Sequence, residues 1–385
     1  MRNVRAFNIT ATGASHIKMN KVCQDASCSH DGDEHILFAI VCDGHGGDDY
    51  IRSDVGSKEA VAVAGSCIRD FINKVLTQYD IGYLQRHYEE VLRGLASSII
   101  SEWRDRIEYH YSANPLTEEE LAKISNRAKK KYLGGDVASA YGTTLIAVAF
   151  TDEYYFGIKI GDGKCVAISK EGAFSTPIPD DGICFLNSTT SLCDKNAIDS
   201  FRYTFSVERP AAIFIGTDGI DDCFCRDGQL FNLYKTVLYS FISSDYDQAF
   251  ADLTEYLPRL SAKGSGDDVS IGAVIDFEAS KNLNMIVNFL NNAAPESSEN
   301  NGDNDGQLTE KALKSDESVI SSFNGNTDPV NVKKEDSGSQ TSVTEPQKKE
   351  IIGFVRTDAG EYVRIDNTRI YKLAAPISEF NRDGR

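Results

Sequence analysis

The 385-residue chain carries 58 acidic and 40 basic side chains, which gives a formal net charge of -18. This charge argues against a surface for nucleic acid or for an anionic membrane, because both bind clustered Lys and Arg. It suits an enzyme that concentrates cations, although acidity can also serve solubility alone. A single core stops growing near about 250–300 residues, so we expect one large domain and a second, smaller piece.

The nine cysteines are scattered without any Cys-x-x-Cys pair. An odd number without a regular framework predicts reduced, mostly buried thiols. No apolar run approaches the roughly 18 residues of a membrane-spanning helix, and Met1 to Thr12 lacks the pattern of a leader. We therefore predict a cytoplasmic protein that does not insert into a membrane.

Apolar runs and amphipathic stretches alternate from Asn3 to about Phe277, as in a packed domain. The predicted strands, in chain order, are Ala6–Ala11, His35–Cys42, Thr143–Phe150, Tyr154–Ile160, Cys165–Ser169, Ala212–Thr217 and Val269–Asp276. The predicted helices are Asp48–Leu76, Gly82–His110, Leu116–Lys131 with Thr117 as its cap, Leu233–Ser243 and Tyr246–Leu260. Because later strands are joined by short turns, antiparallel sheets with helices outside them are favoured.

Beyond Phe277 the composition changes, and residues 291–350 contain few large apolar side chains. Such a segment cannot bury enough apolar surface to offset the conformational entropy that it would lose on folding. We predict a main domain over 1–280, a disordered acidic and polar linker over 281–350 and a short β-rich module over 351–385. Within the module, Phe354–Arg356 and Tyr362–Arg364 flank a turn that is typical of a hairpin, followed by a third strand. It either docks a protein partner or folds back onto the main domain.

Three apolar runs end in an Asp-Gly pair, with the carboxylates of Asp43, Asp162 and Asp218 at rigid strand ends. A fourth acidic site, Asp267-Asp268, directly precedes a strand. If the fold brings these ends together, the like charges need a cation between them. Oxygen donors suit Mg²⁺, Mn²⁺ or Ca²⁺ better than Zn²⁺. A single Asp-Gly pair is most often a turn, whereas three such pairs and a paired Asp predict a metal site.

One histidine, His45, lies within the glycine-rich stretch Asp43-Gly44-His45-Gly46-Gly47. We expect the flanking glycines to leave it without packing partners at the mouth of the carboxylate site. A protonated imidazole there can donate to a departing alkoxide. The stretch lacks the Lys-Ser/Thr ending of a nucleotide-phosphate loop.

Several motifs in order resemble the type 2C metal-dependent protein serine/threonine phosphatase family, and its bacterial subgroup more than the animal one. The match runs from about residue 5 to residue 277. The Asp-Gly-His-Gly-Gly element is rather specific, and the ordered set of motifs with these spacings is strongly specific. The motifs are Gln24-Asp25-Ala26, Asp43-Gly44-His45-Gly46-Gly47, Gly142-Thr143-Thr144, Gly161-Asp162-Gly163, Thr217-Asp218-Gly219-Ile220-Asp221-Asp222 and Asp267-Asp268-Val269-Ser270. The resemblance implies an α+β fold with four layers, α-β-β-α: a central antiparallel β-sandwich flanked by α-helices on both sides.

The resemblance also implies a centre of two Mn²⁺ or Mg²⁺ ions. Asp43 bridges both ions, the Gly44 carbonyl binds one, and Asp218 and Asp267 complete the other. The same resemblance implies that Asp162 helps to hold a third, looser ion.

It further implies Asp25 as a metal ligand and His45 as the general acid. Water activated between the ions attacks phosphorus in line, without a phosphoenzyme. Lys170 to Tyr203 correspond to the family's mobile flap.

Some positions depart from the family pattern. Gln24 stands where many relatives have an acidic residue, and Asn20 replaces the arginine that binds substrate phosphate. Gly163-Lys164 replaces Ser-Arg. We expect Lys18, Lys21 and Thr143 to contact the substrate phosphate instead.

The expected substrate is a phosphorylated protein, paired with a cognate Ser/Thr kinase or its target. Two alternatives stay open: a catalytically weak phosphatase-like regulator that acts through its flap and C-terminal tail, and a small-molecule phosphohydrolase.

Overall fold

The computed structural model describes residues 3–33, 35–181 and 189–283, and the backbone of 351–356, 362–366 and 370–372. The chain divides into two compact units, Met1–Thr327 and Asp328–Arg385. Residues 284–350 of the predicted linker and 182–188 of the predicted flap lie outside the described residues. The first residues of the predicted linker are structured, since Lys281 ends a helix and Leu283 is buried.

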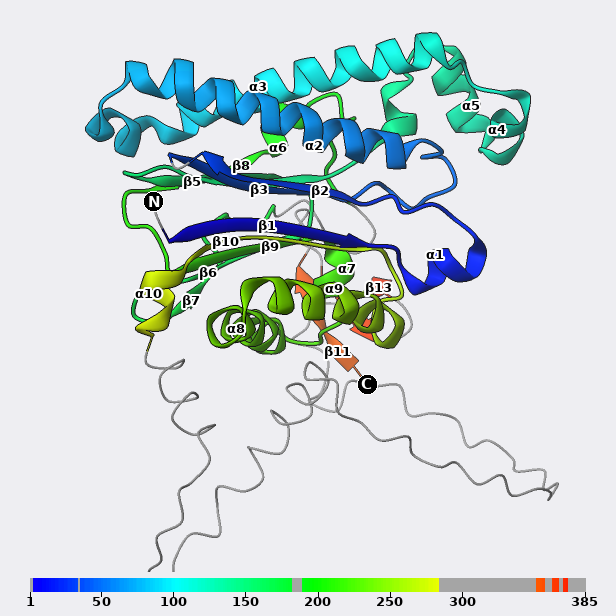
Figure 1. Cartoon of the computed structure of the whole chain (residues 1–385). Coiled ribbons are helices and arrows are strands. Elements are labelled where there is room, and N and C mark those ends of the chain that lie inside the picture. Colours follow the sequence, from blue (N-terminus) through cyan, green and yellow to red (C-terminus); the bar gives the residue numbers. More distant parts are fainter. Residues whose placement is uncertain are drawn as a thin grey trace, which may run out of the picture. The chain divides into compact units, whose positions relative to one another are not determined.

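Two five-stranded antiparallel sheets form the centre of the first unit (Figure 1). The first sheet has the order β1 (Val4–Ala11), β10 (Val269–Asp276), β9 (Ala212–Gly216), β6 (Lys164–Ile168) and β7 (Phe174–Ser175). The second has the order β2 (Ala26–Asp33), β3 (Ile36–Cys42), β4 (Leu145–Phe150), β5 (Tyr155–Ile160) and β8 (Arg202–Ser206). Buried side chains of both sheets, such as Val41, Ile146, Ile213 and Val274, pack against one another between them.

Two layers of helices cover the outer faces of the sheets (Figure 1). The long helices α2 (Ser53–Asp70) and α3 (Ile81–Ala113) pack on the second sheet, and α8 (Asp227–Ser243) and α9 (Tyr246–Lys263) pack on the first. Trp103 of α3 is fully buried and donates from Nε1 to the carbonyl of Gly56 in α2 (2.9 Å). The predicted α-β-β-α arrangement is confirmed.

Short elements complete the unit. They are α1 (Ala14–Met19), α4 (Glu118–Lys123), α5 (Asn126–Leu133), α6 (Ala197–Ser200), α7 (Asp218–Asp221), α10 (Phe277–Lys281), a π-helical turn at Phe71–Val75 and 3₁₀ turns at Leu76–Gln78 and Ala138–Tyr141. No helix among the described residues is long and apolar enough to span a membrane. The eight cysteines within the described ranges are free thiols.

One predicted helix was wrong in its extent, and the strands β2, β7 and β8 were not predicted. The single helix predicted over Leu116–Lys131 is broken into α4 and α5, because Asp49 accepts hydrogen bonds from the backbone N–H and the hydroxyl of Ser125 (both 2.8 Å), which then caps α5. Strand β2 was missed because it is polar rather than alternating. Its Ser27 and Ser29 hydrogen-bond with Asn8 of β1 (2.9 and 2.8 Å).

The second unit contains an antiparallel sheet of β11 (Ile351–Arg356), β12 (Tyr362–Asp366) and β13 (Ile370–Lys372). β11 and β12 form the predicted hairpin, and β13 pairs with β12 as the third strand. The domain boundaries and the docking role of this module stay predictions.

Candidate metal centre

Three strand ends meet at one end of the sandwich, between the sheets. Asp43 follows β3 and Asp162 comes after β5, both in the second sheet, whereas Asp218 comes after β9 of the first. One carboxylate oxygen of each side chain lies within 4.8 Å of the others. The fold thus brings together three acidic residues that are far apart in the sequence, as the strand-end pattern predicted.

The start of β4 holds the backbone of Asp43 in place. The Thr144 N–H donates to the carbonyl oxygen of Asp43 (2.8 Å), and the Thr144 hydroxyl accepts from the Asp43 N–H (3.0 Å). Thr143 is fully buried and donates its hydroxyl to the same carbonyl (2.9 Å). This geometry indicates that Thr143 positions Asp43, in contrast to the predicted contact with a substrate phosphate.

Two glycines that follow the acidic residues allow close approach of other backbone segments. A Cβ atom on Gly44 would lie 2.5 Å from the carbonyl oxygen of Gln24 and 2.7 Å from that of Ser53. A Cβ atom on Gly219 would overlap the carbonyl oxygen of Asp268. Glycine is therefore required where the strand ends converge.

The carboxylates repel one another in a poorly solvated place. Burial raises the pKa of Asp43 well above its usual range, and Asp218 and Asp25 raise it further. Burial and Asp162 raise the pKa of Asp218 to about 6. Oδ1 of Asp162 is buried and has no hydrogen-bond partner among the described residues. A hard cation would relieve the repulsion and use the free oxygen, so the donors present fit Mn²⁺ or Mg²⁺.

Asp25 lies beside these three residues but is not one of the group within 4.8 Å. Its side chain is buried, and Oδ2 accepts a hydrogen bond from the hydroxyl of Thr217 (2.8 Å), the residue before Asp218. Burial raises the pKa of Asp25 to about 8, and Asp268 and Asp218 contribute to the rise. Asp25 therefore extends the acidic centre into the interior.

The residues before β10 form a second group, His16, Asp267 and Asp268, whose ligand atoms also lie within 4.8 Å of one another. Asp267 is exposed and contributes to the raised pKa values of Asp43 and Asp218, so its charge acts on the first group. Asp268 is buried and faces His16, with 2.9 Å between Oδ2 and Nδ1. His16 was not among the site residues predicted from the sequence.

The ring of His45 is packed, so the expectation that it lacks packing partners was wrong. It contacts the ring of Tyr50 edge-on, with 4.7 Å between centroids, and a Cβ atom on Gly142 would lie 2.5 Å from its Cδ2. Burial lowers the pKa of His45, while the charges of Asp162 and Asp194 act in the opposite direction. The imidazole therefore lies close enough to Asp162 of the acidic centre for the carboxylate charge to affect its pKa.

The three departures from the family pattern have defined structural roles. Gln24 donates from Nε2 to the carbonyl of His45 (3.1 Å) and to Oγ of Ser53 (2.6 Å), while its buried Oε1 has no partner among the described residues. Asn20 ends α1 in the left-handed conformation (φ 53°), which asparagine tolerates. Lys164 pairs with Asp180 (3.2 Å). The predicted phosphate contacts Lys18 and Lys21 are exposed beside Asn20.

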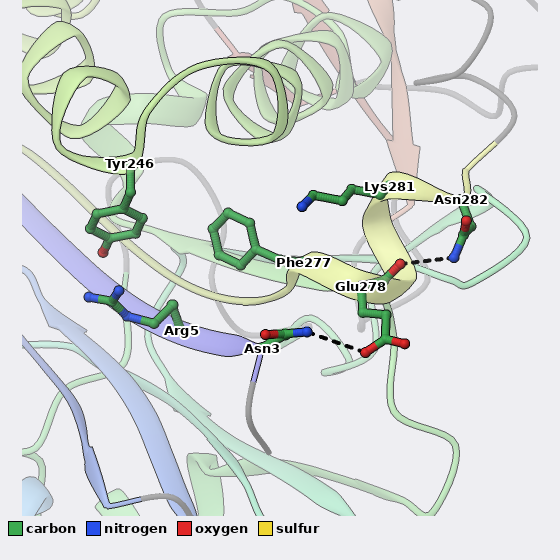
Figure 2. A pocket seen from close by; sticks show the side chains of 7 residues that line it. All are labelled: Asn3, Arg5, Tyr246, Phe277, Glu278, Lys281 and Asn282. Carbon is green, nitrogen blue, oxygen red and sulfur yellow. Dashed lines mark hydrogen bonds between the residues drawn. The ribbon is translucent and has the colours of Figure 1, made fainter.

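A separate hollow of about 510 Å³ lies where β1 begins (Figure 2). It is lined by the rings of Tyr246 and Phe277 and by Arg5, whose guanidinium lies 4.4 Å from the Tyr246 ring centroid and 2.6 Å from Asp31. Since the start of β1 pairs with the end of β10, this hollow is at the other end of the strands from Asp267. None of the predicted site residues lines it.

A four-layer sandwich with clustered carboxylates at the strand ends defines the class of protein: an α-β-β-α protein with an acidic centre between its sheets. A family model described as Protein phosphatase 2C matches residues 12–261. The chain belongs to the protein phosphatase 2C family, and the predicted enzyme class is confirmed at the level of the family. No match was found among curated protein sequences.

Similar solved structures include a bacterial serine phosphatase (15% identity, TM-score 0.43, covering 71% of this chain and 98% of that one). PppA of Pseudomonas aeruginosa is 16% identical, with a TM-score of 0.44 and coverage of 71% and 98%. The S. agalactiae serine/threonine phosphatase is 14% identical, with a TM-score of 0.44 and coverage of 71% and 99%. Because the identities and TM-scores of these structures are low, the assignment of the chain to the family depends on the family model alone.

Proposed function

We propose that this chain hydrolyses phosphoserine and phosphothreonine in proteins, with two Mn²⁺ or Mg²⁺ ions held at the acidic centre. The observation that carries the proposal is the meeting of Asp43, Asp162 and Asp218 within 4.8 Å, although they are far apart in the sequence. Half-buried carboxylates at this separation are costly without a cation, and oxygen ligands select hard ions.

The acidic residues of the centre would bind the ions in the way that the family resemblance implies. Asp43, the Gly44 carbonyl, Asp218 and Asp267 would hold the two ions, with Asp43 shared between their sites. The charge that Asp267 exerts on Asp43 and Asp218 supports its inclusion. Asp162 would help to hold a third, looser ion, and its Oδ1, which has no hydrogen-bond partner among the described residues, supports this role.

Asp25 would add a further carboxylate ligand behind the centre, next to Thr217. Bound ions of this kind lower the pKa of water and stabilise charge on the phosphoryl oxygens. The protein's own residues orient the substrate and handle the proton.

His45 is the general acid that protonates the departing serine or threonine oxygen. Tyr50 and Gly142 fix the plane of its ring, and the bond from Gln24 Nε2 to its carbonyl fixes the loop. Thr143 and Thr144 hold Asp43 relative to this loop. Lys18 and Lys21 supply positive charge for the incoming phosphate, in place of the arginine that Asn20 replaces.

The physiological substrate would be a phosphorylated protein of the cell interior, whose phosphate is added by a cognate Ser/Thr kinase. A catalytically weak regulator is the second candidate. Gln24 and Asn20 favour it, because an acidic residue and an arginine are missing from positions that bind metal and phosphate in the family.

Turnover of a phosphothreonine peptide and of a nucleotide, measured side by side during a Mn²⁺ titration, tests the proposal. We expect Mn²⁺-dependent release of phosphate from the peptide, loss of that release in Asp43→Asn, and much slower release from the nucleotide. Faster nucleotide hydrolysis would support a small-molecule phosphohydrolase. Absence of metal-dependent turnover on either substrate would leave the regulator as the better account.

A further inference from the structure

A short segment beside the metal centre exposes large apolar side chains. Ile17, Met19 and Val22 are 64%, 55% and 63% exposed. Among the described residues, the other large apolar side chains with high exposure are spread singly over distant elements. We name the segment 17–22 the α1 strip. Contiguous exposed apolar groups indicate an interaction surface more often than scattered ones do.

The α1 strip is firmly attached to the domain, so its exposure does not come from a loose loop. Ser15 N–H donates to the carbonyl of Gly266 (2.8 Å), and Lys21 N–H donates to the carbonyl of His16 (2.9 Å). Gln24 N–H donates to Oδ2 of Asp268 (2.7 Å), the carboxylate that also faces His16. The segment is therefore fixed on both sides to the residues next to β10.

This attachment places the α1 strip at the edge of the proposed active site. Val22 is three residues from Asp25, a distance of at most about 10 Å along the chain. α1 lies at the end of the sandwich, outside both helical layers (Figure 1). A protein substrate with its phosphate at the acidic centre would extend over this edge.

The charge of the α1 strip differs from that of its surroundings. Lys18 and Lys21 are exposed between the apolar side chains, and residues 13–23 include no acidic residue. The chain as a whole has a net charge of -18. An acidic segment approaching this protein is therefore repelled by most of its surface and attracted at the α1 strip.

We propose that the α1 strip docks the segment of the substrate protein next to its phosphorylated residue, and that it prefers apolar side chains flanked by Asp or Glu. This inference rests on the proposed phosphatase function and adds a substrate class to it. Ile17, Met19 and Val22 supply the apolar contact, and the two lysines attract the carboxylates.

Two phosphothreonine peptides of equal length test the docking. One has Leu and Phe beside acidic residues, and the other has Ser and Lys at the same positions. We expect the wild type to prefer the first by about tenfold in kcat/KM. The variant Ile17→Ser/Met19→Ser/Val22→Ser should lose most of this preference. It should still hydrolyse p-nitrophenyl phosphate like the wild type, because it keeps Lys18 and Lys21 and because this substrate has no flanking side chains to contact Ile17, Met19 and Val22.

Tyr109→Ser/Val207→Ser is the matched control, because it removes exposed apolar side chains from other elements (78% and 37% exposed). It should keep the preference. Fluorescence anisotropy of the same labelled peptides measures docking without turnover, and the triple variant should bind the first peptide several-fold more weakly. A wild type without preference in either assay overturns the inference.

A triple variant that keeps the preference also overturns it. So does a triple variant that changes only the oligomeric state of the protein, since the occupant would then be a second copy. If no substrate is hydrolysed but the anisotropy preference is present and lost in the triple variant, the proposed function fails while the docking surface stands.

Discussion

Nδ1 of His16 lies 2.9 Å from Oδ2 of Asp268, and both side chains are buried. The same carboxylate accepts hydrogen bonds from the backbone N–H groups of Gly13 (2.6 Å) and Gln24 (2.7 Å). One side chain thus connects α1, the segment leading to Asp25 and the start of β10. It fixes the position of Asp267, its neighbour, relative to the centre.

Replacing His16 should therefore reduce both stability and metal affinity. Loss of a buried hydrogen bond to a charged group costs about 1–3 kcal/mol, so His16→Ala should lower the free energy of unfolding by that amount. Mn²⁺ affinity, measured by calorimetry, should fall because Asp267 is less well positioned. His35→Ala is the control, since His35 pairs with Asp152 at the surface (2.6 Å, side chains 77% and 46% exposed). Equal effects of the two substitutions would refute this role.

Arg52 and Glu120 form a bidentate ion pair that joins the start of α2 to α4. Nε of Arg52 donates to Oε1 of Glu120 (2.9 Å), and Nη2 donates to Oε2 (3.0 Å). The hydrogen bond from Arg52 lowers the pKa of Glu120 from 4.5 to about 2. A lowered pKa in the folded state gives stability that is present above pH 4.5 and is lost as the pH falls toward about 2. Glu120→Gln should therefore be less stable than the wild type near neutral pH, and the difference should shrink on acidification.

Urea unfolding at several pH values measures this difference. Asp54→Asn, which removes an exposed i,i+4 pair with Lys58 (3.1 Å), is the control and should change stability little at any pH. A Glu120→Gln penalty that stays constant down to about pH 3 would show that the ion pair is not its source.

Substitution of His45 should slow hydrolysis by an amount that depends on the leaving group of the substrate. A serine or threonine alkoxide needs a proton as it departs, whereas p-nitrophenolate leaves without one. We expect His45→Gln to lower kcat on a phosphothreonine peptide by about 10²–10⁴-fold. The loss on p-nitrophenyl phosphate should be much smaller. Similar losses on both substrates would argue that His45 has a structural role beside Tyr50.

A chain that ends at residue 285 should keep the turnover of small substrates. Leu283, the last described residue of the first unit's continuous structure, is buried, and the catalytic candidates all precede it. Thermal melting and p-nitrophenyl phosphate turnover of the shortened chain check this. Collapse of soluble expression would instead indicate that Ile351 to Leu373 belong to the core.

The strand-end carboxylates and the layer order were predictable from the sequence, because buried strands have continuous apolar runs and Asp-Gly pairs mark their ends. Asp43, Asp162 and Asp218 each follow such a run. β2 was not predictable in this way, since Ser27 and Ser29 pair with polar groups of β1 across the sandwich.

The role of His16 also depends on tertiary contacts, because its partner Asp268 is 252 residues away in the sequence. The same is true of the break between α4 and α5, which Asp49 causes through Ser125. Local patterns contain no signal for such contacts.

The most direct test of the account is calorimetric titration of Mn²⁺ into the wild type and Asp218→Asn, with peptide turnover measured on the same samples. We predict that the wild type binds about two ions and releases phosphate, and that the variant loses an ion and the turnover. The metal-free variant should be at least as heat-stable as the wild type, because the repulsion between Asp218 and Asp162 is relieved. Unchanged Mn²⁺ binding and turnover in Asp218→Asn would contradict the proposed metal centre.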